Sequence, residues 1–403
     1  MAINPEVTDA QGLLAVPTDV SGTNRTVAAQ RIATLRRRLS LAPDNPMAWA
    51  ELARQHTLTG HLDKAKNAMR VAITRAPNDR YLLRATARLF HHMGELEKAH
   101  AVISRAPRTP SDPWLIAAEI TLAGLTNQDS RFVKTGRRLL ESGIPPIHLS
   151  ELASVLATLE LDAGHSTHAR RLFREALKDP AENALAQAEW AAAHIRLDVE
   201  PYLHSVPSSW EARALAAAVA GEPEITISEA WGWFYDQPFA SGPAVFGSYH
   251  AAKHGRFSEG ANFARDGVAA NPRSFLLRNN LAFCLAKIGD TGAAEQQIHF
   301  IKKEQLNSDQ EATVEATCGL IAFRSGKPKE GAARYKRALE LLPDGESRLL
   351  ALINLAVETL RTDPTQGDSL ARQSYETAGR LGMRADRAAW LTQLKPEPSD
   401  TKA

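Results

Sequence analysis

Apolar residues along this chain recur at helical spacing, and turn residues interrupt the pattern at short intervals. In the segment 46–79, for example, Trp49, Leu52 and Ala53 precede a glycine and Met69 follows it. Apolar positions three and four residues apart lie on one face of an α-helix, which packing can then bury. Alanine and leucine dominate the composition, which favours helices over strands. The pattern therefore predicts an all-α protein built from short helices.

The interrupting glycines and prolines keep a fixed phase. A spacing of 34 residues joins the following positions: Gly60 to Gly94, Gly221 to Gly255, Gly255 to Gly289, Pro43 to Pro77, and Pro238 to Pro272. The later prolines come 17 residues after a glycine, and Gly326 and Pro343 keep the same offset. Unrelated loops would not stay in phase, so the chain is predicted to consist of internal repeats of about 34 residues.

Each repeated residue has a mechanical reason. Glycine can end a first helix in a left-handed conformation that other residues avoid. Proline cannot continue a helix and so ends the second one. Small residues between them let two helices pack about 8–10 Å apart. One hairpin cannot bury its apolar stripe alone, whereas stacked hairpins form a continuous core.

This pattern resembles the tetratricopeptide repeat. That repeat has Trp, Leu, a small residue, Tyr, Gly, Ala, Phe, Ala and Pro in fixed order, and three units carry much of it. The matches are Trp49, Leu52, Ala53, Gly60, Ala65, Met69, Ala72 and Pro77; then Leu281, Ala282, Leu285, Gly289 and Ala294; then Gly319, Gly326, Tyr335, Ala338 and Pro343. The resemblance implies a right-handed α-solenoid, a superhelix of stacked antiparallel hairpins whose first helices line a concave groove.

The repeat divides the chain into five predicted parts. Residues 1–26 are expected to be a flexible tail, and 27–183 an array with a capping helix and about four hairpins. Residues 184–206, interrupted by Pro201, are expected to form a degenerate hairpin or hinge. A second array with its own capping helix, from Arg384, is predicted over 207–394, followed by a disordered tail at 395–403.

The resemblance also implies which residues face the groove. In the N-terminal units they are Arg54, Tyr81, Arg84, Arg88, His91 and His92. Arginines four residues apart share one helical face, so these residues predict a basic groove that captures an acidic peptide. The alternative is a solvated basic face that binds nothing.

In the C-terminal units, the same repeat positions combine aromatic residues with lysine, arginine and asparagine: Tyr249, Lys253, Asn279, Phe283, Lys287, Phe323, Arg324 and Asn354. Such side chains suit an extended peptide, unless Phe283 and Phe323 pack inside the superhelix. Family members that grip a terminal carboxylate use five specific residues, of which only Asn280 is present. A carboxylate clamp is therefore not expected.

An aromatic segment leaves a further alternative open. Trp231, Trp233, Phe234, Tyr235 and Phe239 fall on one second helix and its end. They either fill space beside the degenerate unit or form an exposed patch for a partner.

No catalytic or metal-binding motif emerges. His250 and His254 are four residues apart, but no glutamate follows the first histidine as in a zinc protease. Cys284 and Cys318 occupy positions where small apolar residues pack, so buried thiols are expected. The chain also lacks the phosphate-loop and nucleophile-elbow sequences. We expect no enzyme activity, no metal and no cofactor.

Charge and composition narrow the functional classes. The net charge is only +2, yet the segment from Arg25 to Arg108 has 16 Lys/Arg against 6 Asp/Glu. This asymmetry suits an acidic partner. The sequence shows neither a membrane span nor a secretory signal, and two cysteines are too few for a disulfide framework. A cytoplasmic protein is expected.

The sequence thus predicts a scaffold or adaptor that binds a peptide or helix of a partner protein in the concave groove. Two alternatives remain: a nucleic-acid-binding helical array, and a regulatory subunit of a partner enzyme whose hinge transmits its state. The near-neutral net charge and the lack of repeated base-reading positions disfavour nucleic acid. The partner's identity and the oligomeric state are not readable from the sequence.

Overall fold

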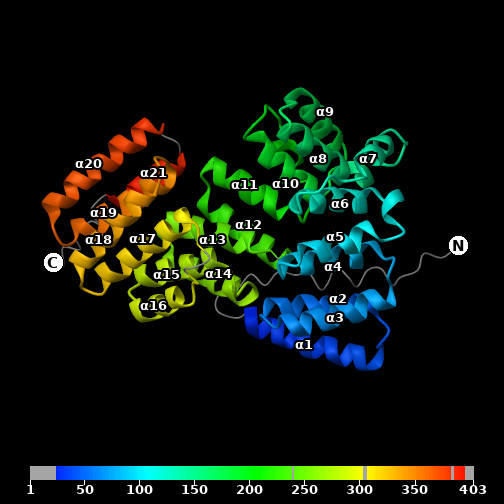
Figure 1. Ribbon diagram of the computed structural model, residues 1–403, viewed down its shortest axis with the longest axis horizontal. Coiled ribbons are helices and arrows are strands. Elements are labelled where there is room, and N and C mark those ends of the chain that lie inside the picture. Colours follow the sequence, from blue (N-terminus) through cyan, green and yellow to red (C-terminus); the bar gives the residue numbers. More distant parts are fainter. Residues whose placement is uncertain (1–23, 238–239, 303–305, 383–384, 395–403) are drawn as a thin grey trace.

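The computed structural model describes residues 24–237, 240–302, 306–382 and 385–394. The predicted tail at 395–403 and residues 1–23 of the predicted tail at 1–26 lie outside this range, whereas residues 24–26 begin a helix. The described part contains 21 α-helices and no strand (Figure 1). The first seven helices are α1 (Asn24–Leu41), α2 (Pro46–Leu58), α3 (Leu62–Arg75), α4 (Arg80–His92), α5 (Leu96–Ser104), α6 (Pro113–Leu125) and α7 (Val133–Leu140).

The middle of the chain contributes α8 (Pro146–Asp162), α9 (Ser166–Ala176), α10 (Glu182–Ala192), α11 (Trp210–Ala220), α12 (Pro223–Asp236), α13 (Gly242–Lys253) and α14 (Phe257–Ala270). The last seven are α15 (Phe275–Lys287), α16 (Thr291–His299), α17 (Ser308–Arg324), α18 (Pro328–Leu341), α19 (Glu346–Leu360), α20 (Pro364–Arg380) and α21 (Ala385–Leu391).

Helix ends follow the chemistry predicted from the repeat. Asp79 accepts a hydrogen bond from the Leu82 amide at the start of α4, which satisfies one free N–H of the first turn. Gly60 and Gly94 both have φ of +76° in the turns after α2 and α4, a conformation that costs other residues energy. Pro77 and Pro272 follow the ends of α3 and α14.

Consecutive helices pack as antiparallel hairpins, and each hairpin stacks on the next. Pairs such as α2 with α3, α8 with α9 and α17 with α18 make the most extensive contacts, and first helices such as α15 and α17 also touch. Alanines at the crossings, including Ala53 and Ala65, are fully buried. This arrangement confirms the predicted all-α solenoid of tetratricopeptide-type hairpins. None of the described helices combines the length and apolarity needed to traverse a lipid bilayer.

The unit after α9 has a first helix but no second one. α10 packs on α8 and α11, and a 3-10 turn (Glu200–Tyr202) stands where a second helix would lie. Pro201 and Pro207 prevent a regular helix there. Ile195, Val199 and Leu203 are nevertheless buried in one cluster with residues of α8 and α9. The stretch from Ile195 to Leu203 thus packs against α8 and α9 without forming a second helix, and the degenerate hairpin or hinge at 184–206 stays a prediction.

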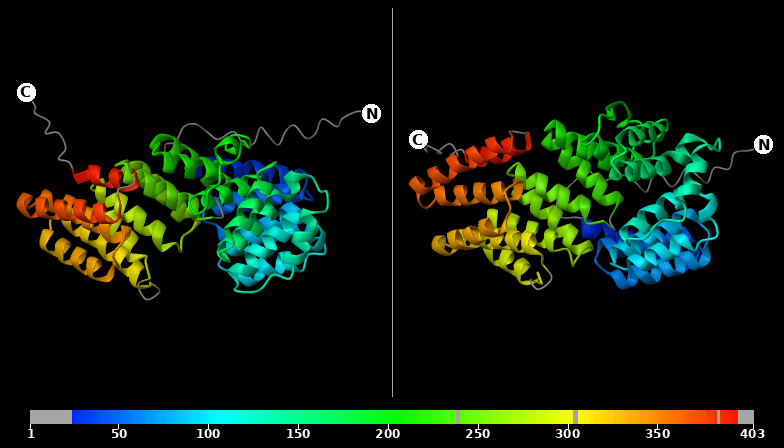
Figure 2. Two further views of the ribbon diagram at one scale, coloured as in Figure 1. Left: turned by 90° about the horizontal axis from the view of Figure 1, so that it is seen from above. Right: turned by 45° about the horizontal axis from the view of Figure 1, so that its top comes forward.

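The N-terminal part of the array turns back on itself. The turn after α2 meets the end of α14, so segments far apart in the sequence lie side by side (Figures 1 and 2). A Cβ added to Gly60 would lie 2.4 Å from the carbonyl oxygen of Ala269. The Arg54 guanidinium also donates a hydrogen bond to the carbonyl oxygen of Tyr235 at the end of α12.

The aromatic segment fills this contact. Trp231 and Phe234 are buried, and Trp231 stacks on Phe263 with ring centroids 3.7 Å apart. Leu58 of α2 packs against the same cluster. The structure therefore favours the space-filling alternative for these two residues, although the space lies against α14 and α2 as well as the degenerate unit. Phe239 lies outside the described residues.

Candidate partner-binding surfaces

The first helices of the N-terminal hairpins enclose a concave cavity of about 760 Å³, called here the N-terminal cavity. Its walls come from α4, α6, α8, α10 and α11, so first helices face the interior as the resemblance implied. The side chains that line it include Arg84, Arg88, His91, Leu125, Glu151, Leu159, Asn183, Trp190 and Glu211.

Large apolar side chains are exposed within this cavity. Leu125, Leu159 and Trp190 have exposed fractions of 47%, 39% and 44%, although each lies on a wall of the concave face. Exposed apolar residues scattered over a surface need no explanation, but three that line one concavity form a patch suited to an apolar ligand group. Trp190 also packs on His194, with ring centroids 4.6 Å apart.

A polar network holds one wall of the cavity in shape. The Arg84 guanidinium donates a hydrogen bond to Oε1 of Glu151, and the Asn183 amide donates to the same oxygen over 3.2 Å. The Arg84 guanidinium also lies over the Trp114 ring, 5.2 Å from its centroid. Oε2 of Glu151 is buried without a hydrogen-bond partner among the described residues. Arg84 therefore joins α4 to α8 instead of standing free for a partner.

The predicted N-terminal groove residues divide into three groups. Arg88 and His91 are exposed and line the cavity, and Arg88 makes no hydrogen bond or ion pair with the described residues. Arg54 is committed to Tyr235 and to Glu51, 3.6 Å away. Tyr81 is 54% exposed and lies outside the cavity wall. His92 is half-buried and is not part of that wall.

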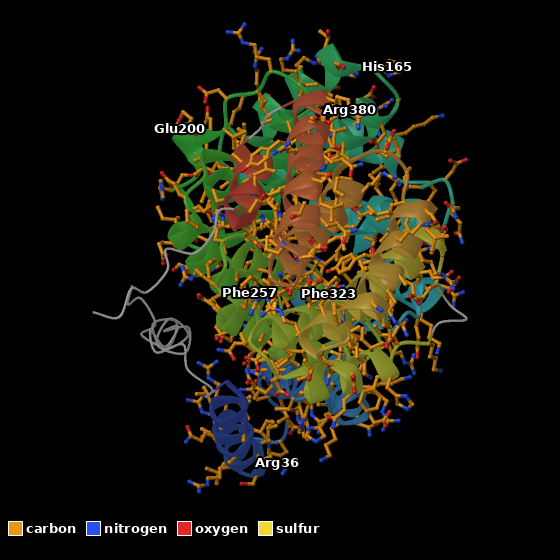
Figure 3. The ribbon with its side chains drawn as sticks, turned by 90° about the vertical axis from the view of Figure 1, so that its left-hand side faces the viewer. Arg36, His165, Glu200, Phe257, Phe323 and Arg380 are labelled. Atoms are coloured by element: carbon orange, nitrogen blue, oxygen red, sulfur yellow. The ribbon has the colours of Figure 1, made fainter. Side chains whose placement is uncertain are left out.

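The basic groove expected from the sequence is therefore a mixed surface. Glu211 and Asp162 line the same cavity as Arg88 and His91. Much of the local basic excess lies elsewhere: Arg36, Arg37 and Arg38 are exposed on α1. In Figure 3, Arg36 lies at the lower edge of the molecule, on α1, which contributes no residue to the cavity wall.

Two carboxylates beside the cavity have altered acidity. Burial raises the pKa of Glu211 to about 7, against the attraction of Arg88 and with repulsion from Glu182. Burial likewise raises the pKa of Asp236 on α12. A charged carboxylate loses solvation when buried, which favours its protonated form. The charge of this region therefore changes near neutral pH.

The C-terminal inner face presents a different picture. We use this name for the surface formed by Tyr249, Lys253, Lys287, Arg324 and Glu358 on α13, α15, α17 and α19. The Lys287 ammonium is 3.1 Å from Oε1 of Glu358, and both side chains are only 2% exposed. Nε of Arg324 is 2.7 Å from Oε2 of the same carboxylate. Two predicted groove cations are thus neutralised by Glu358, which the sequence prediction did not include.

The other predicted C-terminal residues are largely packed. Phe323 is buried against Tyr335, with ring centroids 6.2 Å apart, which favours the packing alternative for this residue. Phe283 is half-buried, with its ring 5.5 Å from the Lys287 ammonium. Asn279 and Asn354 are buried, and each has a side-chain oxygen without a hydrogen-bond partner in the described residues.

The chain itself occupies part of the C-terminal inner face. Trp390 of α21 donates from its indole to the Tyr249 hydroxyl over 3.3 Å. After α21, a 3-10 turn (Thr392–Leu394) brings the Gln393 amide 3.2 Å from the Lys253 carbonyl oxygen. The predicted capping helix thus reaches back to α13 and does not cover the final hairpin alone.

Other chemically interesting residues have structural partners. Cys284 is fully buried, and burial raises the pKa of its thiol to about 12, so it is a poor nucleophile. Cys318 is half-buried. His250 is buried against Phe246, with ring centroids 4.2 Å apart. Asn280, the one residue that matched the carboxylate clamp, donates to the Ser248 hydroxyl over 2.9 Å.

Sequence reasoning missed the apolar part of the N-terminal cavity. Groove positions were assigned in the two N-terminal units and in the C-terminal units, whereas Leu125, Leu159 and Trp190 lie in the units between them. The sequence did contain a signal for these residues, because Leu125 and Leu159 recur at corresponding places near the end of a first helix.

Comparisons with known proteins give a loose structural likeness only. No family model matches the chain, and no curated protein matches it. Among solved structures, yeast Tom70 is 13% identical with a TM-score of 0.35 and covers 92% of each chain. Human IFIT1, solved as a dimer with PPP-AAAA, is 13% identical with a TM-score of 0.37, covering 90% of this chain and 93% of that one.

A tetratricopeptide repeat protein from Parabacteroides merdae is 12% identical with a TM-score of 0.31, covering 78% of this chain and 98% of that chain. These superpositions are too loose to support any statement about partners. The assignment to tetratricopeptide-type hairpins rests on the helix pairing and the repeat described above.

Proposed function

We propose that this protein is a binding scaffold that holds a segment of a partner protein in the N-terminal cavity. The observation that carries the proposal is the exposure of Leu125, Leu159 and Trp190 on the walls of one concave surface. Tryptophan is among the residues most enriched at the energetic centres of interfaces. A cavity that spans five helices suits a peptide or helix better than a compact metabolite.

Charge gives the partner a polarity. Arg88 and His91 lie on α4 at one side of the cavity, whereas Glu211 and Asp162 come from α11 and α8. We infer that the bound segment carries an acidic group toward α4 and an apolar side chain toward Trp190. Arg88 is the cation best placed for steering, because Arg54 and Arg84 are already paired.

Neither alternative function has a comparable observation behind it. A nucleic acid would need a continuous cationic track, whereas this cavity contains Glu211 and Asp162. A regulatory subunit would use the same binding cavity, so it is a special case of the proposal. We propose a binding role without catalysis, in the cytoplasm, since a reduced buried thiol such as Cys284 suits a reducing compartment.

The test is selection of peptides on the whole protein. A random peptide library is panned against the full chain, and the affinities of enriched peptides are measured by fluorescence anisotropy. Trp190→Ala is expected to weaken binding about tenfold or more, and Arg88→Ala less, with a larger loss at low salt. Lys178→Ala, on an exposed ion pair beyond α9, is the matched control.

Enriched peptides that bind Trp190→Ala and the unaltered protein equally well would remove the cavity from the proposal. So would a single-stranded RNA that binds at physiological salt and whose affinity falls with Arg88→Ala but not with Trp190→Ala, because the cavity would then bind phosphates by charge without using its apolar wall.

A further inference from the structure

The C-terminal inner face is covered in part by a segment that follows the last hairpin. Hairpins from α13 to α20 pair and stack with one another in sequence order. The segment 385–394, formed by α21 and the 3-10 turn, joins them through contacts with α19 and α20 and through hydrogen bonds to α13. Tyr249, which bonds Trp390, is 141 residues away from it in sequence.

The segment contacts the array as an amphipathic peptide would. Trp390, Leu391 and Leu394 are buried and belong to the same hydrophobic cluster as Leu285 and Ile353 of the array. Residues at these spacings project from one face of a helical turn. Ala388 and Thr392 are exposed on the other side. One apolar face thus docks while the opposite face meets solvent.

The polar contacts use one side chain that the resemblance assigns to a ligand and one backbone carbonyl. Tyr249 was expected to face the groove, and its hydroxyl accepts the hydrogen bond from the Trp390 indole, 3.3 Å away. The Gln393 amide donates to the Lys253 carbonyl, at the end of α13, where a helix leaves its last carbonyls without helical partners. The site therefore accepts hydrogen bonds from two donors three residues apart, the Trp390 indole and the Gln393 amide.

We propose that the C-terminal inner face is a second peptide-binding site, and that the segment 385–394 occupies it as an intramolecular ligand. Its external ligand is an amphipathic helical segment of a partner protein with the pattern Trp-Leu-x-x-Leu and an amide before the last leucine. The two compete for one surface, so the partner binds only when the chain's own segment leaves. This site is separate from the N-terminal cavity and does not depend on its proposed function.

The argument for exchange is geometric. Because the segment is linked to α20 by a short connection, its local concentration at the site is high, which allows tight occupancy with weak intrinsic affinity. An external segment must overcome that advantage, so the free site is much more receptive than the occupied one. The same contacts would also serve a permanent cap, and the experiment must separate a cap from a ligand.

A protease site inserted between Gly382 and Ala385 of the full chain provides that separation. After cleavage, the segment is removed by size-exclusion chromatography and detected by mass spectrometry. A fluorescent peptide of residues 385–396 is then titrated onto the cut protein and onto the uncut protein. We expect saturable binding to the cut protein, and binding at least about tenfold weaker to the uncut one.

Peptide variants test the proposed contacts. Substitution W390A in the peptide is expected to reduce affinity about tenfold or more, whereas T392A, on the exposed side, should change it less than about twofold. Tyr249→Phe in the protein removes the accepting hydroxyl and should weaken the peptide severalfold. Trp190→Ala in the N-terminal cavity should leave the affinity of this peptide unchanged.

Three outcomes would overturn the proposal. Equal peptide affinity of cut and uncut protein would show that the segment does not cover the site. Loss of helical circular dichroism once the segment is removed would identify it as an integral cap. A stable dimer of the uncut protein that exchanges 385–394 between copies would make a second copy of the chain, and not a partner, the occupant.

Discussion

The two ends of this solenoid use the same hairpin geometry but treat their inner faces in opposite ways. The N-terminal cavity exposes Trp190 to solvent, whereas the C-terminal inner face buries Trp390. Arg88 makes no hydrogen bond or ion pair with the described residues in the first, whereas Lys287 is buried against Glu358 in the second. In this protein, the inner face is therefore accessible to a partner in the N-terminal cavity, whereas the chain's own side chains occupy it at the C-terminal end.

The difference follows from how each half ends. The N-terminal half turns back so that α2 meets α14, and α4, α6, α8, α10 and α11 line a hollow in it. The C-terminal half does not turn back in this way, and the segment 385–394 lies against its inner face at α13. The N-terminal half thus keeps an open cavity, whereas the segment 385–394 covers part of the C-terminal inner face.

The largest expected effect tests the sealed ion pair. Glu358→Ala leaves the Lys287 ammonium buried without its counter-ion, because both side chains are 2% exposed. We expect the C-terminal helices to lose about 3–5 kcal/mol of stability. Hydrogen exchange of α15 and α19, resolved by peptide mass spectrometry, measures the loss locally, as is appropriate for an array that need not unfold in one step.

The N-terminal counterpart sharpens the comparison. Glu151→Ala frees Arg84, whose side chain is 16% exposed and also lies over the Trp114 ring, 5.2 Å from its centroid. Access to water and to the ring reduces the cost to about 1–3 kcal/mol. Glu340→Ala, on the exposed side of α18, should be near neutral. Equal losses for Glu358→Ala and Glu151→Ala would contradict the claim that one face is sealed and the other open.

The next effect tests the contact that closes the N-terminal half. Gly60 and Gly94 share a repeat position and a φ of +76°, so alanine strains both turns by about 1–2 kcal/mol. At Gly60, the added Cβ would also lie 2.4 Å from the Ala269 carbonyl oxygen, whereas nothing lies within 4 Å at Gly94. Gly60→Ala should therefore cost about 1–3 kcal/mol more.

Thermal unfolding followed by circular dichroism ranks the two variants, and hydrogen exchange in α14 locates the effect. If α2 and α14 separate in solution, the two glycine variants should differ little and α14 should exchange alike in both. The comparison is informative because local backbone strain is common to the pair.

The sequence predicted the repeat but not the way it closes. Gly60, Gly94 and Pro77 reveal hairpin boundaries because left-handed turns and helix ends restrict the residue type. The contact between Gly60 and Ala269 has no such local signature, since any residue pair can meet once the superhelix has curved. Small rotations between successive hairpins accumulate into that curvature.

The candidate site was predicted in part for a similar reason. Repeat positions identified Arg88 and His91 as inner residues, and the structure places both on the cavity wall. They could not show that Lys287 is neutralised by Glu358, because that pairing joins helices 71 residues apart. Nor could they show that Trp390 would cover Tyr249.

A smaller effect comes from Glu211 beside the N-terminal cavity. Its pKa is raised to about 7 by burial, above the value of 4.5 for a solvated glutamate, so the folded state binds its proton more tightly than the unfolded state. The stabilisation is complete below about pH 4.5 and is lost as pH rises through about 7, a change on the order of 1–3 kcal/mol.

Glu211→Gln should remove most of that pH dependence. Unfolding by urea at pH 5 and pH 8 measures the difference for the unaltered protein and the variant, with hydrogen exchange of α11 as the local readout. Glu376→Gln, an exposed position on α20, is the control. A stability difference between the two pH values that is the same in Glu211→Gln would assign the effect to other groups, of which Asp236 is the first candidate.

The smallest effect on stability is expected at the residue with the largest proposed effect on binding. Trp190 is 44% exposed and contributes to the cavity wall, so Trp190→Ala should change the free energy of unfolding by less than about 1 kcal/mol. Phe173 of α9 is fully buried in the adjacent cluster, and Phe173→Ala should cost about 3–5 kcal/mol. Urea unfolding monitored by circular dichroism measures both. If Trp190 served packing, Trp190→Ala would destabilise the protein as Phe173→Ala does. If it serves a ligand, Trp190→Ala lowers peptide affinity and leaves the fold intact. A large destabilisation by Trp190→Ala would therefore show that this residue belongs to the hydrophobic core.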